Sequence, residues 1–239
     1  MSDLSHIEKI VFDFDNTLFD TETKKQNLYK MAEIHGYSHD EARQIYKKAR
    51  TENEKIIMSL SSYMKVLRER VNEDDKEFKS DQVSEIITEL KGGDGLLPYA
   101  AEFLKYCLSE GLETYVLSLG QKDWQEEKVQ QSGIKDFMPE DNIVYTNSTN
   151  GGKQRFLRQL FGDDFTGSET LFVNDKPDET GDILSDFPDL LAMLRREPRD
   201  DRYQDEDFKR LKEQYPQRVI TYSEQLKQLL DKFKHNYED

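Results

Sequence analysis

The segment IVFDFDNTLFDT at residues 10–21 carries side chains whose types and spacing could do chemistry. After an apolar run at 10–12, it places Asp13 and Asp15 two positions apart and then the hydroxyl of Thr17. At that spacing, side chains leave an extended chain on the same face, so the two carboxylates would lie close together. Like charges so close are costly unless a cation, a shared proton or a substrate balances them. The segment therefore predicts a site for a metal ion and an electrophile.

Apolar runs elsewhere indicate the elements that would position this site. The runs that predict strands lie at residues 10–12, 113–117, 142–145, 170–173, 190–194 and 219–220. From the second run onward they alternate with helical patterns, which favours right-handed crossovers and a parallel sheet with helices on both faces. The expected fold class is α/β, with a doubly wound, mostly parallel sheet.

Residues 22–91 differ, because no strand pattern interrupts them. The sequence SHDE at 38–41 predicts a capping box at a helix start. An apolar stripe over residues 83–90 indicates an amphipathic helix, which we expect Ser80 or Asp81 to cap.

The helical stretch predicts a domain inserted into the α/β fold. We expect the core to comprise residues 1–21 and 92–239, and an all-helical cap to comprise residues 22–91. An insertion directly after the first strand is well placed to cover the carboxyl end of that strand as a lid.

Polar residues also end later strands. Ser118 follows the strand at 113–117 and precedes Leu119, Asp175 follows the strand at 170–173, and Lys153 lies near the start of a predicted helix. Because the carboxyl ends of parallel strands share one edge, these groups can converge on Asp13. Carboxylates suit Mg²⁺, and a hydroxyl and an ammonium suit phosphate. Neither Cys nor His occupies these positions, so zinc is disfavoured.

These motifs resemble those of the haloacid dehalogenase-like hydrolase superfamily, in the subgroup with a helical cap after the first strand. The resemblance extends over about residues 8–232 and rests on four motifs in order. They are DFDNT at 13–17, the strand that ends at Ser118, Lys153, and VNDKPDE at 173–179. The resemblance implies a Rossmann-like core.

The resemblance also implies an activity, that of a Mg²⁺-dependent phosphoric monoester hydrolase working through an aspartyl-phosphate. Asp13 would be the nucleophile, and Asp15 the general acid for the leaving alcohol and then the base for water. Lys153 would offset charge and orient Asp13. The residues implied for phosphate binding are Thr17, Ser118, Leu119 and Lys153.

The resemblance implies Mg²⁺ as the cofactor. Asp13, the backbone carbonyl of Asp15, and Asp175 would hold the ion. Glu179 would complete the outer metal shell, with Asp178 and Asp182 as competitors. Two departures stand out, since Asn174 replaces the usual glycine and Lys153 lacks the proline that often follows it.

Of three alternative functions, the first is disfavoured and the other two remain open. A dehalogenase resembling this fold lacks an acid at the position of Asp15, because halide leaves without a proton, so a phosphoester is favoured. A phosphomutase of the sugar-phosphate type needs an acid or base from the cap, where His35 and His39 are the only histidines, and we expect both on the surface. The third is a catalytically silent binding or regulatory protein.

Two other lysines, Lys122 and Lys128, are alternatives to Lys153 for the lysine of the site, and we expect both on exposed helix faces.

Composition limits the partners. The 239 residues carry a formal net charge of −15, which repels nucleic acid in the absence of a basic patch. The single cysteine, Cys107, lies in a helical apolar pattern and is expected in the core, which suits a reducing compartment. We see neither a signal-peptide pattern nor a membrane span, and expect a cytoplasmic enzyme. The expected partner is a small-molecule phosphoester, and the sequence carries no signal for oligomeric state.

Overall fold

The computed structural model describes residues 4–51, 59–120, 122–146 and 152–238, and the chain divides into two compact units. The α/β unit comprises Met1–Asp20, Leu96–Leu119 and Gly133–Asp239. The helical unit comprises Thr21–Gly95 and Gly120–Ser132, so that residues 120–132 group by their contacts with the inserted helices. The assignment of residues 22–91 as a cap domain stays a prediction.

The α/β unit is built on a six-stranded sheet in which every neighbouring pair of strands is parallel. In sheet order the strands are β3 (Ile143–Thr146), β2 (Glu113–Leu119), β1 (Lys9–Phe12), β4 (Thr170–Asn174), β5 (Leu191–Arg195) and β6 (Val219–Ser223). The predicted parallel α/β fold is confirmed, and each strand overlaps a predicted apolar run. This order makes β1 the point where the strand sequence reverses, which is where doubly wound sheets bind ligands.

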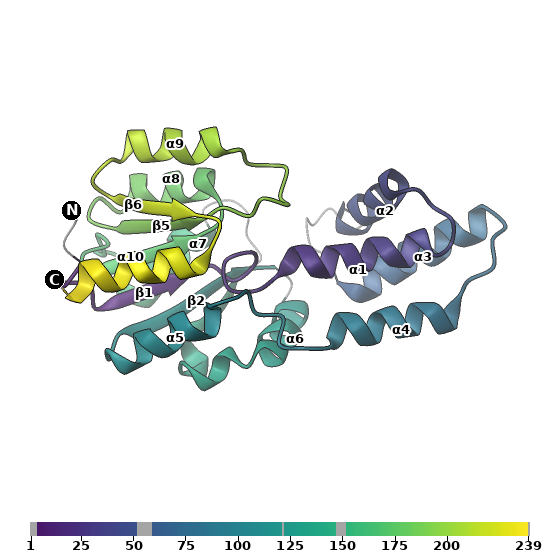
Figure 1. The fold of residues 1–239 in the computed structure, drawn as a ribbon, viewed down its shortest axis with the longest axis horizontal. Coiled ribbons are helices and arrows are strands. Elements are labelled where there is room, and N and C mark those ends of the chain that lie inside the picture. Colours follow the sequence, from purple (N-terminus) through teal and green to yellow (C-terminus); the bar gives the residue numbers. More distant parts are fainter. Residues whose placement is uncertain (1–3, 52–58, 121, 147–151, 239) are drawn as a thin grey trace. The chain divides into compact units, whose positions relative to one another are not determined.

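Helices cover both faces of the sheet (Figure 1). One face carries α5 (Ala100–Ser109) and α10 (Leu226–Glu238), and the other carries α7 (Gly152–Phe161), α8 (Pro177–Asp186) and α9 (Asp205–Gln214). Phe12 packs its ring 5.2 Å from that of Phe103 on α5, while Val11 shares a core with Leu157 and Ile183 on the opposite face. Strand β1 is therefore buried on both sides, as its apolar sequence requires.

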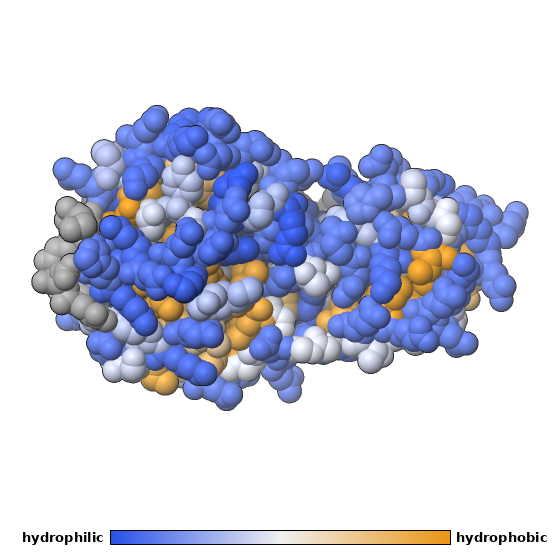
Figure 2. Space-filling model, viewed as in Figure 1, coloured by the Kyte–Doolittle hydropathy of each residue, from blue (hydrophilic) through white to orange (hydrophobic). Residues whose placement is uncertain are grey.

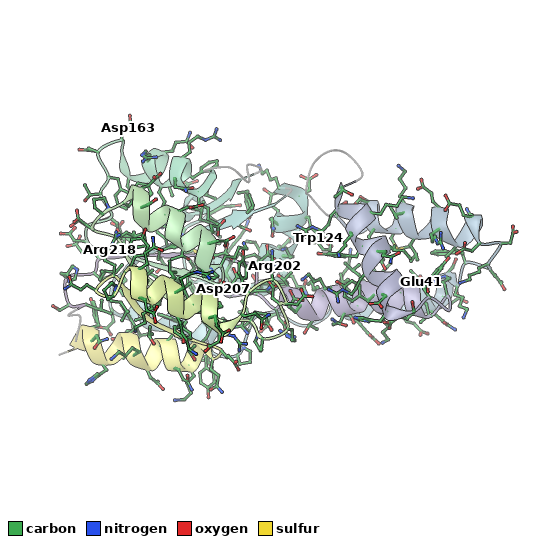
Figure 3. All side chains as sticks on the ribbon, turned by 90° about the horizontal axis from the view of Figure 1, so that it is seen from above. Glu41, Trp124, Asp163, Arg202, Asp207 and Arg218 are labelled. Carbon is green, nitrogen blue, oxygen red and sulfur yellow. The ribbon has the colours of Figure 1, made fainter. Side chains whose placement is uncertain are left out.

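The helical unit has a hydrophobic core of its own. Its helices are α1 (Thr21–Glu33), α2 (His39–Thr51), α3 (Leu60–Glu73), α4 (Ser80–Lys91) and α6 (Lys122–Ser132). Two short 3₁₀ helices, η1 (Ile134–Asp136) and η2 (Glu140–Asn142), follow α6 in the chain and belong to the α/β unit. The fully buried Tyr63 of α3 donates its hydroxyl hydrogen to the carbonyl of Leu28 on α1. Trp124 of α6, labelled in Figure 3, is partly buried against this core.

The capping box predicted at 38–41 is confirmed at the start of α2. The backbone N–H of Ser38 donates to the Glu41 carboxylate at 2.8 Å, and the Ser38 hydroxyl accepts from the Glu41 backbone N–H at 3.3 Å. The predicted cap of α4 is wrong, because the helix already includes Ser80 and the residue before it, Lys79, makes no side-chain cap. The Lys79 backbone N–H donates instead to the ring of His35 at 3.0 Å.

The expected surface position of His35 is also wrong, because His35 packs against the start of α4 and accepts a hydrogen bond from Lys79. His35 is buried, its Nδ1 donates to the carbonyl of Met31 at 2.7 Å, and its Nε2 accepts from Lys79. Burial lowers the pKa of His35, and Lys79 and Lys76 lower it further against the Met31 hydrogen bond, so the ring is neutral. His39 lies at the surface as expected and bonds Glu33.

The surface and the single cysteine agree with the composition. The face of the molecule in Figure 2 is mostly hydrophilic, with small apolar areas between charged side chains. Within the described residues, no helix is both long and apolar enough to cross a membrane. Cys107 is fully buried, as predicted, and burial raises the pKa of its thiol to about 12.

A partly buried ion cluster stabilises the segment that follows β5. Arg195 donates to Glu197 Oε2 at 2.9 Å, and Arg199 donates to both oxygens of Glu197, at 2.7 Å from Nε and 2.9 Å from Nη2. The Arg195 and Glu197 side chains are 7% and 2% exposed. Burial alone would raise the pKa of Glu197, but the hydrogen bonds from Arg199 and the charge of Arg195 outweigh it and lower the pKa to about 2.

This cluster predicts an acid-dependent contribution to stability. The pKa of Glu197 is lower in the folded chain than its usual 4.5, so the stabilisation is present above that value and is lost as pH falls toward about 2. Glu197→Gln, which mimics the protonated residue, should cost roughly 3 kcal/mol at neutral pH and progressively less below pH of about 4.5. Urea unfolding of both proteins across this range measures the difference, with Glu224→Gln at an exposed ion pair as control. A cost that is independent of pH would contradict the prediction.

Candidate active site

The predicted site residues that follow the strands lie at one edge of the sheet. Asp13 directly follows β1, Ser118 is the penultimate residue of β2, and Asp175 directly follows β4. Phe12 of β1 pairs in register with Val116 of β2 and with Val173 of β4. The three side chains therefore leave neighbouring strands at the same carboxyl edge.

Strand β2 is longer than predicted, which changes the setting of Ser118. Its pairing with β3 continues through Ser118 with Tyr145 and Leu119 with Thr146. Ser118 thus lies within the strand and is fully buried, while Leu119 ends the strand and is half-buried.

A buried ion pair joins Asp13 to Lys153. The Lys153 ammonium, near the start of α7, lies 2.5 Å from Asp13 Oδ1 and 2.6 Å from Glu179 Oε2. The Asp13 and Lys153 side chains are each 2% exposed. The Thr17 hydroxyl lies 3.4 Å from the second Asp13 oxygen, Oδ2, and donates to it. The Asp13 carboxylate is therefore held at both oxygens, and its charge is balanced without solvent.

Neither rival lysine takes this place. Lys122 is 67% exposed and pairs with Glu126 on its own helix, as expected of a solvated lysine. Lys128 is buried in the helical unit, so its predicted exposure is wrong. The burial of Lys128 depends on helices that pack against α6 and are distant from it in sequence. The sequence of α6 alone therefore does not show which of its faces is buried.

The residue in the usual glycine position, Asn174, organises the turn after β4. Its side-chain amide donates to Glu179 Oε2 at 3.0 Å and to the Thr180 hydroxyl at 3.1 Å. Its side-chain carbonyl accepts from the backbone N–H of Asp175 at 3.0 Å. Asn174 therefore fixes Glu179 and Asp175 relative to each other, which a glycine could not do.

The three competing acids of α8 have different surroundings. Glu179 contacts Lys153, whereas Asp178 accepts a hydrogen bond from Tyr203 at 2.7 Å and Asp182 is exposed. Burial would raise the pKa of Glu179, but Lys153 and Lys176 outweigh it and lower the pKa to about 2. Of the three acids, Glu179 is therefore the one that lies beside Lys153, and it is ionised.

Sequence reasoning missed Lys176. Its ammonium lies 3.9 Å from Asp175 Oδ1 and 3.8 Å from Glu179 Oε2. Burial would lower the pKa of Lys176, but the charges of Asp13, Asp175 and Glu179 raise it above its usual value, so the group is protonated. The sequence signal was a lysine directly after the metal-ligand candidate Asp175.

Asp15 lies in the tight turn that follows β1. It is half-buried, pairs through its backbone with Phe19, and is close enough for its charge to raise the pKa of Lys176. The next residue, Asn16, has a φ of 60°, a left-handed conformation that asparagine tolerates better than most residues. This conformation reverses the chain directly after Asp15.

The site has donors suited to a divalent cation and a phosphate. Two fully buried oxygens, Asp175 Oδ1 and Ser118 Oγ, have no hydrogen-bond partner in the described protein. Burial raises the pKa of Asp175 to about 7, with Lys176 opposing the shift and Asp13 adding to it.

The described residues contain no group of three or more His, Cys, Asp or Glu side chains that could hold a metal by themselves. Magnesium, however, usually takes only one or two carboxylates and fills its remaining positions with waters and substrate oxygens. The four carboxylates of the site, Asp13, Asp15, Asp175 and Glu179, also outnumber the two ammonium groups of Lys153 and Lys176. The residues present therefore fit Mg²⁺.

Comparison with known proteins gives a family and a fold. The family model described as haloacid dehalogenase-like hydrolase matches residues 7–180. Curated protein sequences give no match.

Many solved structures share the fold, and the three described below have TM-scores of 0.57 to 0.61. A HAD-family hydrolase from Deinococcus radiodurans with bound phosphate and sodium is 13% identical, with a TM-score of 0.61 and 97% of each chain covered. The HAD-hydrolase YfnB of Bacillus subtilis bound to magnesium is 14% identical, with a TM-score of 0.57 over 98% of this chain and 99% of the other. The L-2-haloacid dehalogenase of Xanthobacter autotrophicus is 16% identical, with a TM-score of 0.57 over 94% of this chain and 97% of the other.

Proposed function

Because this chain belongs to the haloacid dehalogenase-like hydrolase family, we propose that it is a Mg²⁺-dependent phosphatase acting on a small phosphorylated metabolite. The observation that carries the proposal is the Asp13 carboxylate, held by Lys153 and Thr17 at the sheet edge where Ser118 Oγ and Asp175 Oδ1 lack a hydrogen-bond partner among the described residues. A fixed, charge-balanced carboxylate beside unsatisfied polar groups is prepared for an incoming phosphoester.

The proposed reaction has two steps. Asp13 attacks phosphorus and forms an aspartyl-phosphate, while the oxygen–phosphorus bond of the ester breaks and the leaving alcohol takes a proton from Asp15. Asp15 then accepts a proton from the water that attacks the phosphoryl group, which releases phosphate and restores Asp13. Lys153 offsets the charge at Asp13, and the Ser118 hydroxyl, without a protein partner, donates to a phosphate oxygen.

The proposed cofactor is Mg²⁺, held by Asp13, Asp175 and the backbone carbonyl of Asp15. When bound, the ion neutralises charge on the phosphoryl oxygens. Lys176 and Lys153 leave part of the negative charge of the site uncompensated, which favours a divalent cation there. The magnesium bound to one relative with this fold, YfnB of Bacillus subtilis, supports this choice.

The site favours this reaction over its alternatives. The relatives with this fold include a haloacid dehalogenase. A halide leaves without a proton, so an acid at the position of Asp15 is needed for a phosphoester and not for a haloacid. A phosphomutase needs an acid or base outside the core, and both ring nitrogens of His35 are already bound to backbone groups. The net charge of −15 and the single cysteine of the sequence support a cytoplasmic enzyme that acts on a small molecule.

Turnover of phosphoesters tests the proposal. Sugar phosphates, nucleotides and para-nitrophenyl phosphate should release phosphate with added Mg²⁺, and excess chelator should slow release by at least about 10²-fold. Phosphate release and product identity are measured together, so an isomeric sugar phosphate would indicate a mutase. Halide release from 2-haloacids without phosphatase activity, or turnover unaffected by chelator, would contradict the proposal.

A further inference from the structure

The turn that carries Asp15 is held by a side chain from a distant strand. Arg195 ends β5, and its Nη1 donates to the carbonyl of Asn16 at 2.5 Å. Arg195 is 6% exposed and Asn16 is 3% exposed, so this contact is shielded from water. Within the turn, the Asn16 backbone N–H donates to the Phe19 carbonyl at 2.8 Å. Both backbone polar groups of Asn16 are therefore engaged.

The guanidinium of Arg195 is itself fixed. Its Nη2 donates to Glu197, which Arg199 holds through both carboxylate oxygens. Arg199 also donates to Asp20 at 2.7 Å. Residues 195–199 thus bind the turn at Asn16, directly after Asp15, and again at Asp20. All of these residues belong to the α/β unit.

A guanidinium suits this role better than an ammonium. Its rigid, planar set of N–H groups donates to Asn16 and Glu197 in fixed relative directions. Losing the bond would remove this donor from the buried carbonyl of Asn16, a residue that already has the left-handed conformation. The peptide between residues 16 and 17 would then be free to rotate, which would change the backbone conformation of Asn16, the residue that directly follows Asp15.

From this geometry we infer that Arg195 is a positioning residue, which aims Asp15 at the leaving group by fixing the Asn16 carbonyl. The inference rests on the proposed function, in which Asp15 protonates the departing alcohol. Arg195 itself need not touch substrate. Its effect should therefore depend on how much the leaving group needs a proton.

Two substrates with different leaving groups separate positioning from a general structural role. An alkyl phosphate releases a basic alkoxide that needs the proton of Asp15, whereas dinitrophenyl phosphate releases a stable phenolate that does not. The measured quantity is kcat/KM, which reports steps up to the first irreversible one and so excludes the later role of Asp15 as base. Arg195→Met should lower kcat/KM by about 10²-fold for the alkyl phosphate and by less than about 3-fold for dinitrophenyl phosphate.

The neighbouring arginine supplies a matched control. The Arg196 guanidinium forms an ion pair with the exposed Glu224. Arg196→Met therefore removes a guanidinium from the residue next to Arg195, and the lost contact is a surface ion pair. It should change neither kcat/KM value by more than about 2-fold. Arg195→Lys keeps the positive charge and N–H donors but loses the planar geometry, so it should lie between wild type and Arg195→Met. It provides a folded variant if Arg195→Met does not fold.

The possible results separate a failure of the positioning role of Arg195 from a failure of the proposed phosphatase function. Equal losses on both substrates in Arg195→Met or Arg195→Lys would overturn the positioning role while leaving the phosphatase intact. If wild type hydrolyses neither phosphoester, the proposed function fails and the inference falls with it. A selective loss on the alkyl phosphate supports both.

Discussion

Asp13→Asn should abolish phosphoester hydrolysis, lowering kcat by at least about 10³-fold, because an amide cannot serve as the attacking carboxylate. The substitution keeps the size of the side chain and an oxygen that can accept from Lys153 or Thr17. Lys153 also retains Glu179 as a charge partner. The free energy of unfolding should therefore change by less than about 2 kcal/mol.

Initial rates with saturating Mg²⁺ and urea unfolding check the two parts of this prediction. Asp163→Asn is the matched control, since Asp163 is exposed in the turn between α7 and β4 and is labelled in Figure 3. The control should match wild type in both measurements. Residual activity above a few per cent in a folded Asp13→Asn protein would rule out Asp13 as the nucleophile.

Lys153→Met should lower both activity and stability. It removes the buried ammonium that lies within 2.6 Å of two carboxylates, Asp13 and Glu179. Stranding these buried charges should cost roughly 3 kcal/mol of folding free energy, and the loss of charge balance at Asp13 should reduce kcat by about 10²-fold or more.

Two further variants separate the effects. Lys122→Met removes an exposed lysine on α6 and should alter neither quantity. Adding Glu179→Gln to Lys153→Met removes one stranded carboxylate, so it should recover part of the stability but little of the activity. If the single variant is as stable and active as Lys122→Met, the buried ion pair does not have the role assigned to it.

The sheet could be predicted because its strands are marked locally. Residues 10–12 are all apolar, as expected of a strand that is covered on both faces of the sheet. Asp13 directly follows this run and marks the end of the strand. The end of β2 was harder to predict. Its apolar run stops before Ser118, yet pairing with β3 extends the strand to Leu119, and such pairing depends on a second segment of chain.

The features that could not be predicted depend on partners far away in sequence. Arg195 and Glu197 look like surface charges in the sequence, and only the fold places Arg195 against Asn16. His35 likewise follows a helix end in the chain but receives a hydrogen bond from Lys79 in a segment 44 residues away. The Asp13 motif was recognisable because its residues are adjacent, whereas the contacts that orient it come from α7, α8 and β5.

The most direct test of Asp13 as the nucleophile is to identify the covalent intermediate. Wild-type protein mixed with Mg²⁺ and a turned-over phosphoester is quenched in acid within one turnover, digested and examined by peptide mass spectrometry. We expect one phosphoryl group on the peptide that contains Asp13, sensitive to hydroxylamine and absent from Asp13→Asn. Turnover without a labelled Asp13 peptide, or a phosphoryl group on any other residue, would contradict it.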